Sequence, residues 1–226
     1  MIQDKIAVSL ETESIEKTLS IVELIKSGGL AGQLIIALLT GLLVVALYIY
    51  FERLFTIKAA SKVDPNFMNQ IKDHVVNGKI EVAKALCVNV NSPVSRLIHK
   101  GISRIGRPLA DINSAIENAG KLEVYSLEKN VSILATISGA APMIGFLGTV
   151  IGMILSIFEI ANSGGQIDIK LLADGLYTAM TTTVAGLVVG IIAYISYNHI
   201  VGRTNKVVYQ MEASSVEFLD LLNEPI

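Results

Sequence analysis

The stretch that decides the fold is residues 130–158, NVSILATISGAAPMIGFLGTVIGMILSIF. It places 29 consecutive uncharged residues between Lys129 and Glu159. An α-helix rises about 1.5 Å per residue, so roughly 20 apolar residues cross a hydrocarbon layer of about 30 Å. The stretch is therefore long enough to span a membrane as one helix.

Two further blocks share this character, with 25 uncharged residues at 27–51 and 28 at 175–202. Buried helices of a soluble protein are an alternative, but three of this length would be unusual. We therefore predict an all-α membrane protein with three transmembrane helices, at 30–51, 131–158 and 175–202. The intervening parts are a periplasmic amphipathic helix at 1–29, a cytoplasmic helical domain at 52–130, a periplasmic loop at 159–174 and a cytoplasmic C-terminal helix at 203–226.

The distribution of basic residues predicts the orientation in the membrane. Residues 52–129 hold 12 of the 18 lysines and arginines, the N-terminal segment three, the loop at 159–174 one and the tail two. Basic residues near span ends favour the cytoplasmic side. The N-terminus is therefore expected in the periplasm and the C-terminus in the cytoplasm of a multi-pass inner-membrane protein.

Turn residues punctuate the predicted cytoplasmic helices. Asp64-Pro65 and Asn91-Ser92-Pro93 are typical helix starts, and Asn77-Gly78 is a typical stop. Asp111 is expected to cap a long helix that runs straight into the second span. Long helical extensions of the second and third spans are therefore part of the predicted fold.

Small and hydroxyl residues recur at helical spacing in the second and third spans. In the second span they fall three or four residues apart, with one carboxylate at the outer rim and one proline that must kink or open the helix. These residues are Gly145, Thr149, Gly152, Ser156, Glu159 and Pro142. The third span has a similar band, made of Asp174 at the rim, Thr178, Thr181, Thr182 and Ala185, with Thr183 beside it.

Two interpretations of these residues stay open from spacing alone. Small residues let helix backbones approach closely in lipid, so the bands could serve packing only. Hydroxyls inside a membrane can instead line a hydrated path or a cavity that holds a partner helix or ions. The run Thr181-Thr182-Thr183 supplies more hydroxyls than packing requires.

Several classes of function are not indicated. His74, His99 and His199 lie far apart, and no metal, cofactor or catalytic motif is present, so neither a metal site nor an enzyme is expected. A net charge of −2 does not favour nucleic-acid binding. Because no acid lies in the middle of a span, proton transfer would need a carboxylate from a partner protein.

Four stretches resemble the MotA/TolQ/ExbB family of motor channel subunits. They are GAAPMIGFLGTVIG at 139–152, GLYTAMTTTVAGL at 175–187, GKIEVAKALC at 78–87 and SPVSRLIHKG at 92–101. The number of spans and the long first cytoplasmic loop are similar to the ExbB/TolQ branch, ExbB most of all. The four-span MotA branch fits less well.

The resemblance implies a homopentamer in the bacterial inner membrane whose second and third spans line a pore. Two ExbD/TolR-like single-span chains would lie in the pore, each with a membrane aspartate that takes up and releases protons. Proton-motive force would then act on a TonB- or TolA-like protein to energise outer-membrane transport. By the motif match, Thr149 and Thr183 correspond to the family's pore threonines.

The sequence departs from the family pattern at Thr178, where many relatives have a glutamate. A hydroxyl cannot change its charge, so proton transfer would depend on the partner's aspartate. A ring of hydroxyls could also coordinate Na⁺, which leaves the coupling ion open. The alternative functions are those of a TolQ-like subunit, of a gliding or flagellar-type stator subunit, and of a structural membrane scaffold without ion flux.

Overall fold

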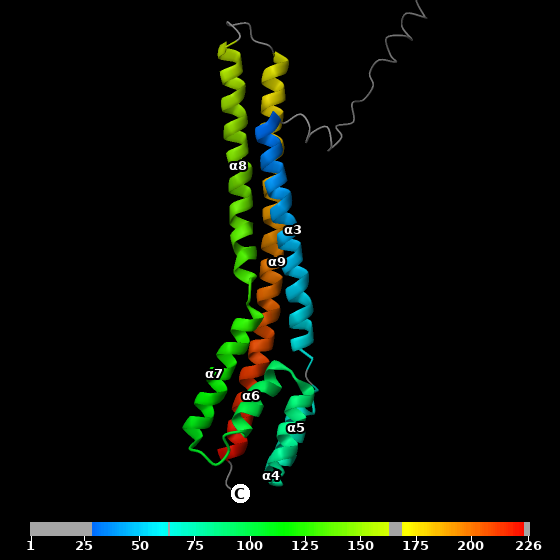
Figure 1. Cartoon of the computed structure of the whole chain (residues 1–226), viewed down its shortest axis with the longest axis vertical. Coiled ribbons are helices and arrows are strands. Elements are labelled where there is room, and N and C mark those ends of the chain that lie inside the picture. Colours follow the sequence, from blue (N-terminus) through cyan, green and yellow to red (C-terminus); the bar gives the residue numbers. More distant parts are fainter. Residues whose placement is uncertain (1–28, 63, 163–168, 224–226) are drawn as a thin grey trace, which may run out of the picture. The chain divides into compact units, whose positions relative to one another are not determined.

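A computed structural model describes residues 29–62, 64–162 and 169–223. Within these ranges the chain forms seven helices and no strand (Figure 1). The helices are α3 (Gly29–Ala60), α4 (Phe67–Val76), α5 (Ile80–Val90), α6 (Pro93–Ile102), α7 (Leu109–Leu127), α8 (Val131–Asn162) and α9 (Ile169–Asn223). The amphipathic helix predicted at 1–29 lies outside the described residues apart from its last residue.

Three of the helices contain segments long and apolar enough to cross a membrane, at Ala31–Ala60, Val131–Asn162 and Gly175–Asn223. They lie in α3, α8 and α9, which confirms an all-α membrane protein with three spans. α9 is a single helix of 55 residues and continues well past residue 202, so the extension of the third span is confirmed.

The helix before the second span is interrupted instead of running straight into it. α7 ends at Leu127, and Asn130 adopts a left-handed backbone with φ 62° before α8 begins at Val131. Asparagine tolerates this conformation better than most residues because its short side chain can bond locally. A short turn therefore separates the extension from the span.

The predicted turn signals account for most boundaries of the short helices. Ser92 caps α6: its Oγ accepts a hydrogen bond from the Ser95 N–H at 3.1 Å, and Ser95 Oγ accepts one from the Ser92 N–H at 2.8 Å. This reciprocal pair satisfies two N–H groups that have no partner within the helix. α7 begins at Leu109, so Asp111 lies in its first turn and does not cap it.

The chain divides into two compact units. The described part of the first unit comprises residues 29–39, 142–162 and 169–187, so it contains parts of α3, α8 and α9. The described part of the second unit comprises residues 40–62, 64–141 and 188–223, with α4 to α7 and the rest of the three long helices.

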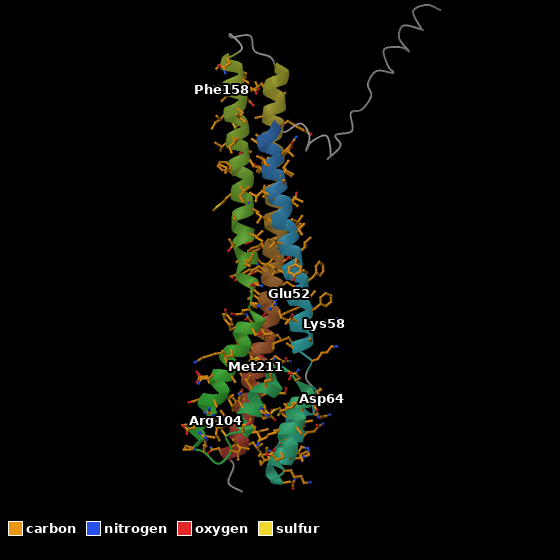
Figure 2. The ribbon with its side chains drawn as sticks, in the orientation of Figure 1. Glu52, Lys58, Asp64, Arg104, Phe158 and Met211 are labelled. Carbon is orange, nitrogen blue, oxygen red and sulfur yellow. The ribbon has the colours of Figure 1, made fainter. Side chains whose placement is uncertain are left out.

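The second unit has a hydrophobic core of its own. Phe67, Ile98 and Phe218 are at most 1% exposed, and Met211, labelled on α9 in Figure 2, is 2% exposed. A buried arginine, Arg53 of α3, donates from Nη1 to the backbone carbonyl of Ser126 near the end of α7 at 3.0 Å. The buried residues of this core come from all seven described helices, so α7 and the C-terminal part of α9 pack into the same unit.

Candidate ion pathway on α8 and α9

In the first unit, α8 and α9 pack against each other through glycines. A Cβ placed on Gly145 would lie 2.8 Å from the carbonyl oxygen of Thr182, and one on Gly152 would lie 3.1 Å from Cβ of Ala179. Since rising residue numbers on α8 meet falling numbers on α9, the two helices are antiparallel. The absence of side chains at these positions lets the backbones approach closely.

The closest approach joins Gly148 of α8 to Thr182 of α9. A Cβ on Gly148 would lie 2.4 Å from Thr182 Oγ1, so no other residue fits without a shift. Thr182 is 0% exposed, and its hydroxyl donates to the Ala179 carbonyl oxygen at 2.8 Å. Thr182 is therefore part of the contact between the two helices within one chain.

The three consecutive threonines point in three directions, because successive residues of a helix are about 100° apart. Thr182 faces α8. Thr183 is half-buried, and its hydroxyl donates to the carbonyl oxygen of Gly145 on α8 at 3.1 Å. Thr181 is also half-buried, but its hydroxyl donates to the Tyr177 carbonyl oxygen of its own helix at 2.9 Å.

Thr149 and Thr183 lie on the same side of the helix pair. Thr149 directly follows Gly148, and Thr183 directly follows Thr182, which is the contact partner of Gly148. In two antiparallel right-handed helices, the residue after each contact residue turns to the same side. Thr149 is half-buried, and its hydroxyl donates to the Phe146 carbonyl oxygen at 2.5 Å. We call Thr149 and Thr183 the threonine pair.

Thr178 lies on a different side of α9. It is five residues before Thr183, or about 140° around the helix. Thr178 is 8% exposed and packs against α3, since a Cβ on Gly32 would lie 2.8 Å from Thr178 Cγ2. The structure therefore separates Thr178 from the threonine pair.

The remaining predicted residues lie at several places in the first unit. Ser156 is 5% exposed, and its Oγ would lie 1.6 Å from a Cβ on Gly175, so it belongs to the α8–α9 contact. Glu159 is exposed near the end of α8, and Asp174 lies within α9, its side chain being outside the described residues. α8 continues through Pro142, which is half-buried.

The threonine pair offers hydrogen-bond acceptors to its surroundings. Both hydroxyl hydrogens are directed at backbone carbonyls, and a hydroxyl oxygen that donates keeps lone pairs free to accept. Such oxygens suit a protonated carboxyl group, a water molecule or a cation. Large apolar side chains elsewhere on the two helices are exposed, including Met143 at 74%, Met180 at 62% and Phe158, labelled in Figure 2, at 62%.

The two interpretations of the small and hydroxyl residues thus apply to different residues. Gly145, Gly152, Ser156 and Thr182 pack α8 on α9, whereas Thr149 and Thr183 lie at the open edge of that contact. Sequence reasoning did not single out Gly148, which is three residues after Gly145 and four before Gly152, or Gly175, which is three residues before Thr178 on α9. Among the described residues, no cluster of histidine, cysteine or carboxylate side chains could hold a metal ion.

Comparison with known proteins identifies the family to which this chain belongs. The sequence profile of the MotA/TolQ/ExbB proton channel family matches residues 89–213. A putative biopolymer transport protein ExbB homolog of Methanothermobacter thermautotrophicus is 27% identical over 194 residues, which are 85% of this chain and 67% of that protein. The biopolymer transport protein ExbB of Aquifex aeolicus is 37% identical over 87 residues, 38% of this chain and 58% of the relative.

A second branch of relatives is named for another system. The Tol-Pal system protein TolQ of Pseudomonas aeruginosa is 23% identical over 214 residues, which cover 90% of this chain and 92% of that protein. The profile match includes α8 and most of α9, as far as residue 213, and hence both members of the threonine pair.

Proposed function

Because this chain belongs to the MotA/TolQ/ExbB proton channel family, we propose that it is the channel-forming subunit of an ion-driven motor in a bacterial inner membrane. Its function is most similar to that of ExbB. Five copies surround a pore, with the N-terminus in the periplasm and the C-terminus in the cytoplasm. An ExbD-like pair of single-span chains lies in the pore. A TonB-like protein transmits the energy to transport across the outer membrane.

The observation that carries this proposal is the position of the threonine pair. Thr149 and Thr183 come from different helices, flank one contact on one side, and direct their hydroxyl hydrogens to backbone carbonyls. Packing alone does not require two half-buried hydroxyls at the edge of a contact that glycines already close. The pair instead provides polar partners for a group that moves along this edge.

In this proposal the ion is carried by a side chain of the single-span partner protein. The described part of the second span has no charged residue between Val131 and Phe158, and Thr178, Thr181, Thr182 and Thr183 are neutral. A hydroxyl does not change charge at physiological pH, so the titrating group is the membrane aspartate of the ExbD-like chain. The threonine pair, helped by the rim acids Glu159 and Asp174, lines the path of that aspartate.

Valine substitution tests the proposal, because valine keeps the shape of threonine and removes the hydroxyl. We expect Thr149→Val and Thr183→Val each to abolish ion flux in liposomes that contain the chain and its single-span partner. The oligomer should still assemble, as measured by its mass in detergent. Thr149→Ser and Thr183→Ser should retain flux.

Thr136→Val is the matched control. Thr136 lies on the same helix, and its exposed hydroxyl donates to the Ser132 carbonyl oxygen at 3.1 Å, much as Thr149 bonds its own helix. Its loss should leave flux unchanged. Wild-type flux in both valine variants of the pair would favour the alternative of another class, a structural membrane scaffold without ion flux.

The remaining alternatives differ in the ion that drives the motor and in the process that the motor energises. A TolQ-like role is supported by the similarity to TolQ of Pseudomonas aeruginosa over 90% of this chain. The acceptor oxygens of the pair also suit Na⁺, as in a sodium-driven stator. Flux that follows a pH gradient at constant Na⁺ would assign the proton, and flux that requires Na⁺ would assign the sodium alternative.

A further inference from the structure

A groove of about 430 Å³ lies on the second unit. Residues of α5, α6 and α7 line it, and α6 packs against both of the other two helices. α6 therefore lies between α5 and α7 along the groove. Each outer helix contributes a large apolar side chain that is exposed, Val88 of α5 at 65% and Leu122 of α7 at 72%. Exposed apolar surface in a groove indicates a place where another molecule binds.

The acid and the arginine of this groove are engaged with each other. Arg96 of α6 donates from Nε and Nη2 to the two carboxylate oxygens of Glu123 on α7, at 2.7 and 2.6 Å. Its Nη1 donates to the carbonyl oxygen and to Oδ1 of Asn91, both at 3.0 Å. Among the described residues of the lining, Glu123 is the only carboxylate. No acid of the groove is left to pair with Lys100, which is exposed and lines the same groove.

The chain around Lys100 has a strong positive bias. Residues 82–110 contain no aspartate or glutamate and five basic residues, which are Lys84, Arg96, Lys100, Arg104 and Arg107. Glu81 and Glu123 neutralise the first two of these through ion pairs. In the described part of the chain, no carboxylate pairs with the other three, and all three are exposed. The electrostatic field at the C-terminal end of α6 therefore attracts anionic groups.

We propose that this groove binds an acidic amphipathic helix that belongs to another protein. Apolar side chains spaced three and four residues apart on that helix cover Val88 and Leu122, and a carboxylate beside them pairs with Lys100. The docking of an apolar helix face into a groove is a recurrent mode of peptide recognition. A basic helix is repelled by Lys100 and the two arginines after it, so charge complementarity selects an acidic occupant.

The inference goes beyond ion conduction and does not depend on it. All residues that line the groove belong to the second unit, and none belongs to the threonine pair. On the predicted topology α5, α6 and α7 face the cytoplasm, so the occupant is a cytoplasmic protein or a cytoplasmic segment of a membrane protein. One apolar side chain on each outer helix and one ion pair make a small contact, and small interfaces are typical of transient binding.

Peptide binding to the full-length protein in nanodiscs tests the proposal. The probe is a fluorescein-labelled peptide of about 15 residues, or four helical turns. Leucine stands at positions three and four apart and glutamate at most others, and empty nanodiscs measure its binding to lipid. We expect saturable binding by fluorescence anisotropy. Lys100→Glu should weaken it about fivefold, as expected for the loss of an exposed ion pair, and a peptide with lysine in place of glutamate should bind at least about tenfold more weakly.

Lys121→Glu is the matched control. It changes the net charge by the same amount at an exposed residue that lies outside the groove lining, so binding should stay as in the wild type. Leu122→Ser should weaken binding about tenfold, because it removes apolar surface that the helix covers. All three replaced side chains are exposed, so the variants should fold, and circular dichroism checks this.

Equal weakening by Lys100→Glu and Lys121→Glu would show that overall charge attracts the peptide and would overturn the groove as its site. Unchanged binding by Leu122→Ser, or no saturable binding to the folded wild-type protein, would also contradict the proposal. A photo-reactive benzoylphenylalanine in place of Val88 provides the second measurement. An adduct with the labelled peptide that excess unlabelled peptide suppresses would support the acidic helix. Adducts formed only between copies of this chain would assign the groove to a second copy instead.

Discussion

The hydroxyl of Thr183 donates a hydrogen bond to the carbonyl oxygen of Gly145 at 3.1 Å and so links α9 to α8 in the first unit. The bond is possible because Gly145 has no side chain and the two backbones are close. It holds Thr183 at the edge of the helix contact with its oxygen available to accept a further hydrogen bond. The same contact that packs the helices therefore positions one of the proposed pathway groups.

Gly148→Ala should destabilise the chain. The new Cβ would lie 2.4 Å from Thr182 Oγ1, and Thr182 is fully buried and cannot move aside. Overpacking of this kind costs about 1–3 kcal/mol. Thermal unfolding in detergent should show a lower midpoint. Gly139→Ala is the control on the same helix, because a Cβ there meets no atom within 4 Å. Equal shifts for the two variants would contradict the close contact.

Thr178→Ala should reduce ion flux without abolishing it. Thr178 lies against Gly32 of α3 and about 140° around α9 from Thr183. Loss of one hydroxyl in a helix contact removes about 0.5–1.5 kcal/mol, equal to a reduction of about two- to thirteenfold. Flux in liposomes checks this, with oligomer mass as the assembly control. A Thr178→Ala protein that assembles normally and conducts nothing would show that this hydroxyl is indispensable.

Arg96→Lys should destabilise the second unit by about 1 kcal/mol, because lysine cannot make the two parallel bonds to Glu123. The Glu123 carboxylate also raises the pKa of Arg96 above its usual range, so the guanidinium stays charged at any working pH. Lys84→Ala breaks a more exposed pair with Glu81 and should cost less than about 0.5 kcal/mol. Denaturant unfolding of both variants measures the difference, and equal costs would contradict it.

Cys87 should react slowly with maleimides at pH 8. The side chain is 1% exposed, and burial raises the pKa of the Cys87 thiol to about 11. Since the thiolate is the nucleophile, the rate should rise about tenfold per pH unit between pH 8 and 10. The folded state favours the neutral thiol, so its contribution to stability is complete below about pH 9 and is lost as pH rises toward 11. Rapid alkylation at pH 7 would contradict this.

Much of the fold follows from local properties of the sequence. The charge-free blocks identify the three spanning helices because a bilayer imposes a minimum apolar length. Ser92 and Pro93 identify the start of α6, because capping depends on residues within one turn. The break at Asn130 was not predicted, since no glycine or proline marks it and asparagine also occurs within helices.

The candidate site could be predicted only in part. The spacing of Gly145, Thr149, Gly152 and Ser156 places them on one broad face of α8, but it could not distinguish the contact with α9 from the edge of that contact. The directions in which these four residues point around the helix axis differ by only a fraction of a turn. Helical spacing does not show where a neighbouring helix lies. Gly148 was overlooked although its spacing from Gly145 and Gly152 fits the same rule.

The sequence alone determined that the chain has three membrane-spanning helices and that small and hydroxyl residues concentrate in the last two. Only the tertiary structure decided that Thr182 is buried between α8 and α9, that Thr178 faces α3, and that Thr149 and Thr183 share one side. The physical reason is that apolar length and helical period are properties of one segment. Whether a side chain faces another helix or lies at the edge of a contact depends on where that other helix lies. The contact joins residues more than 30 positions apart.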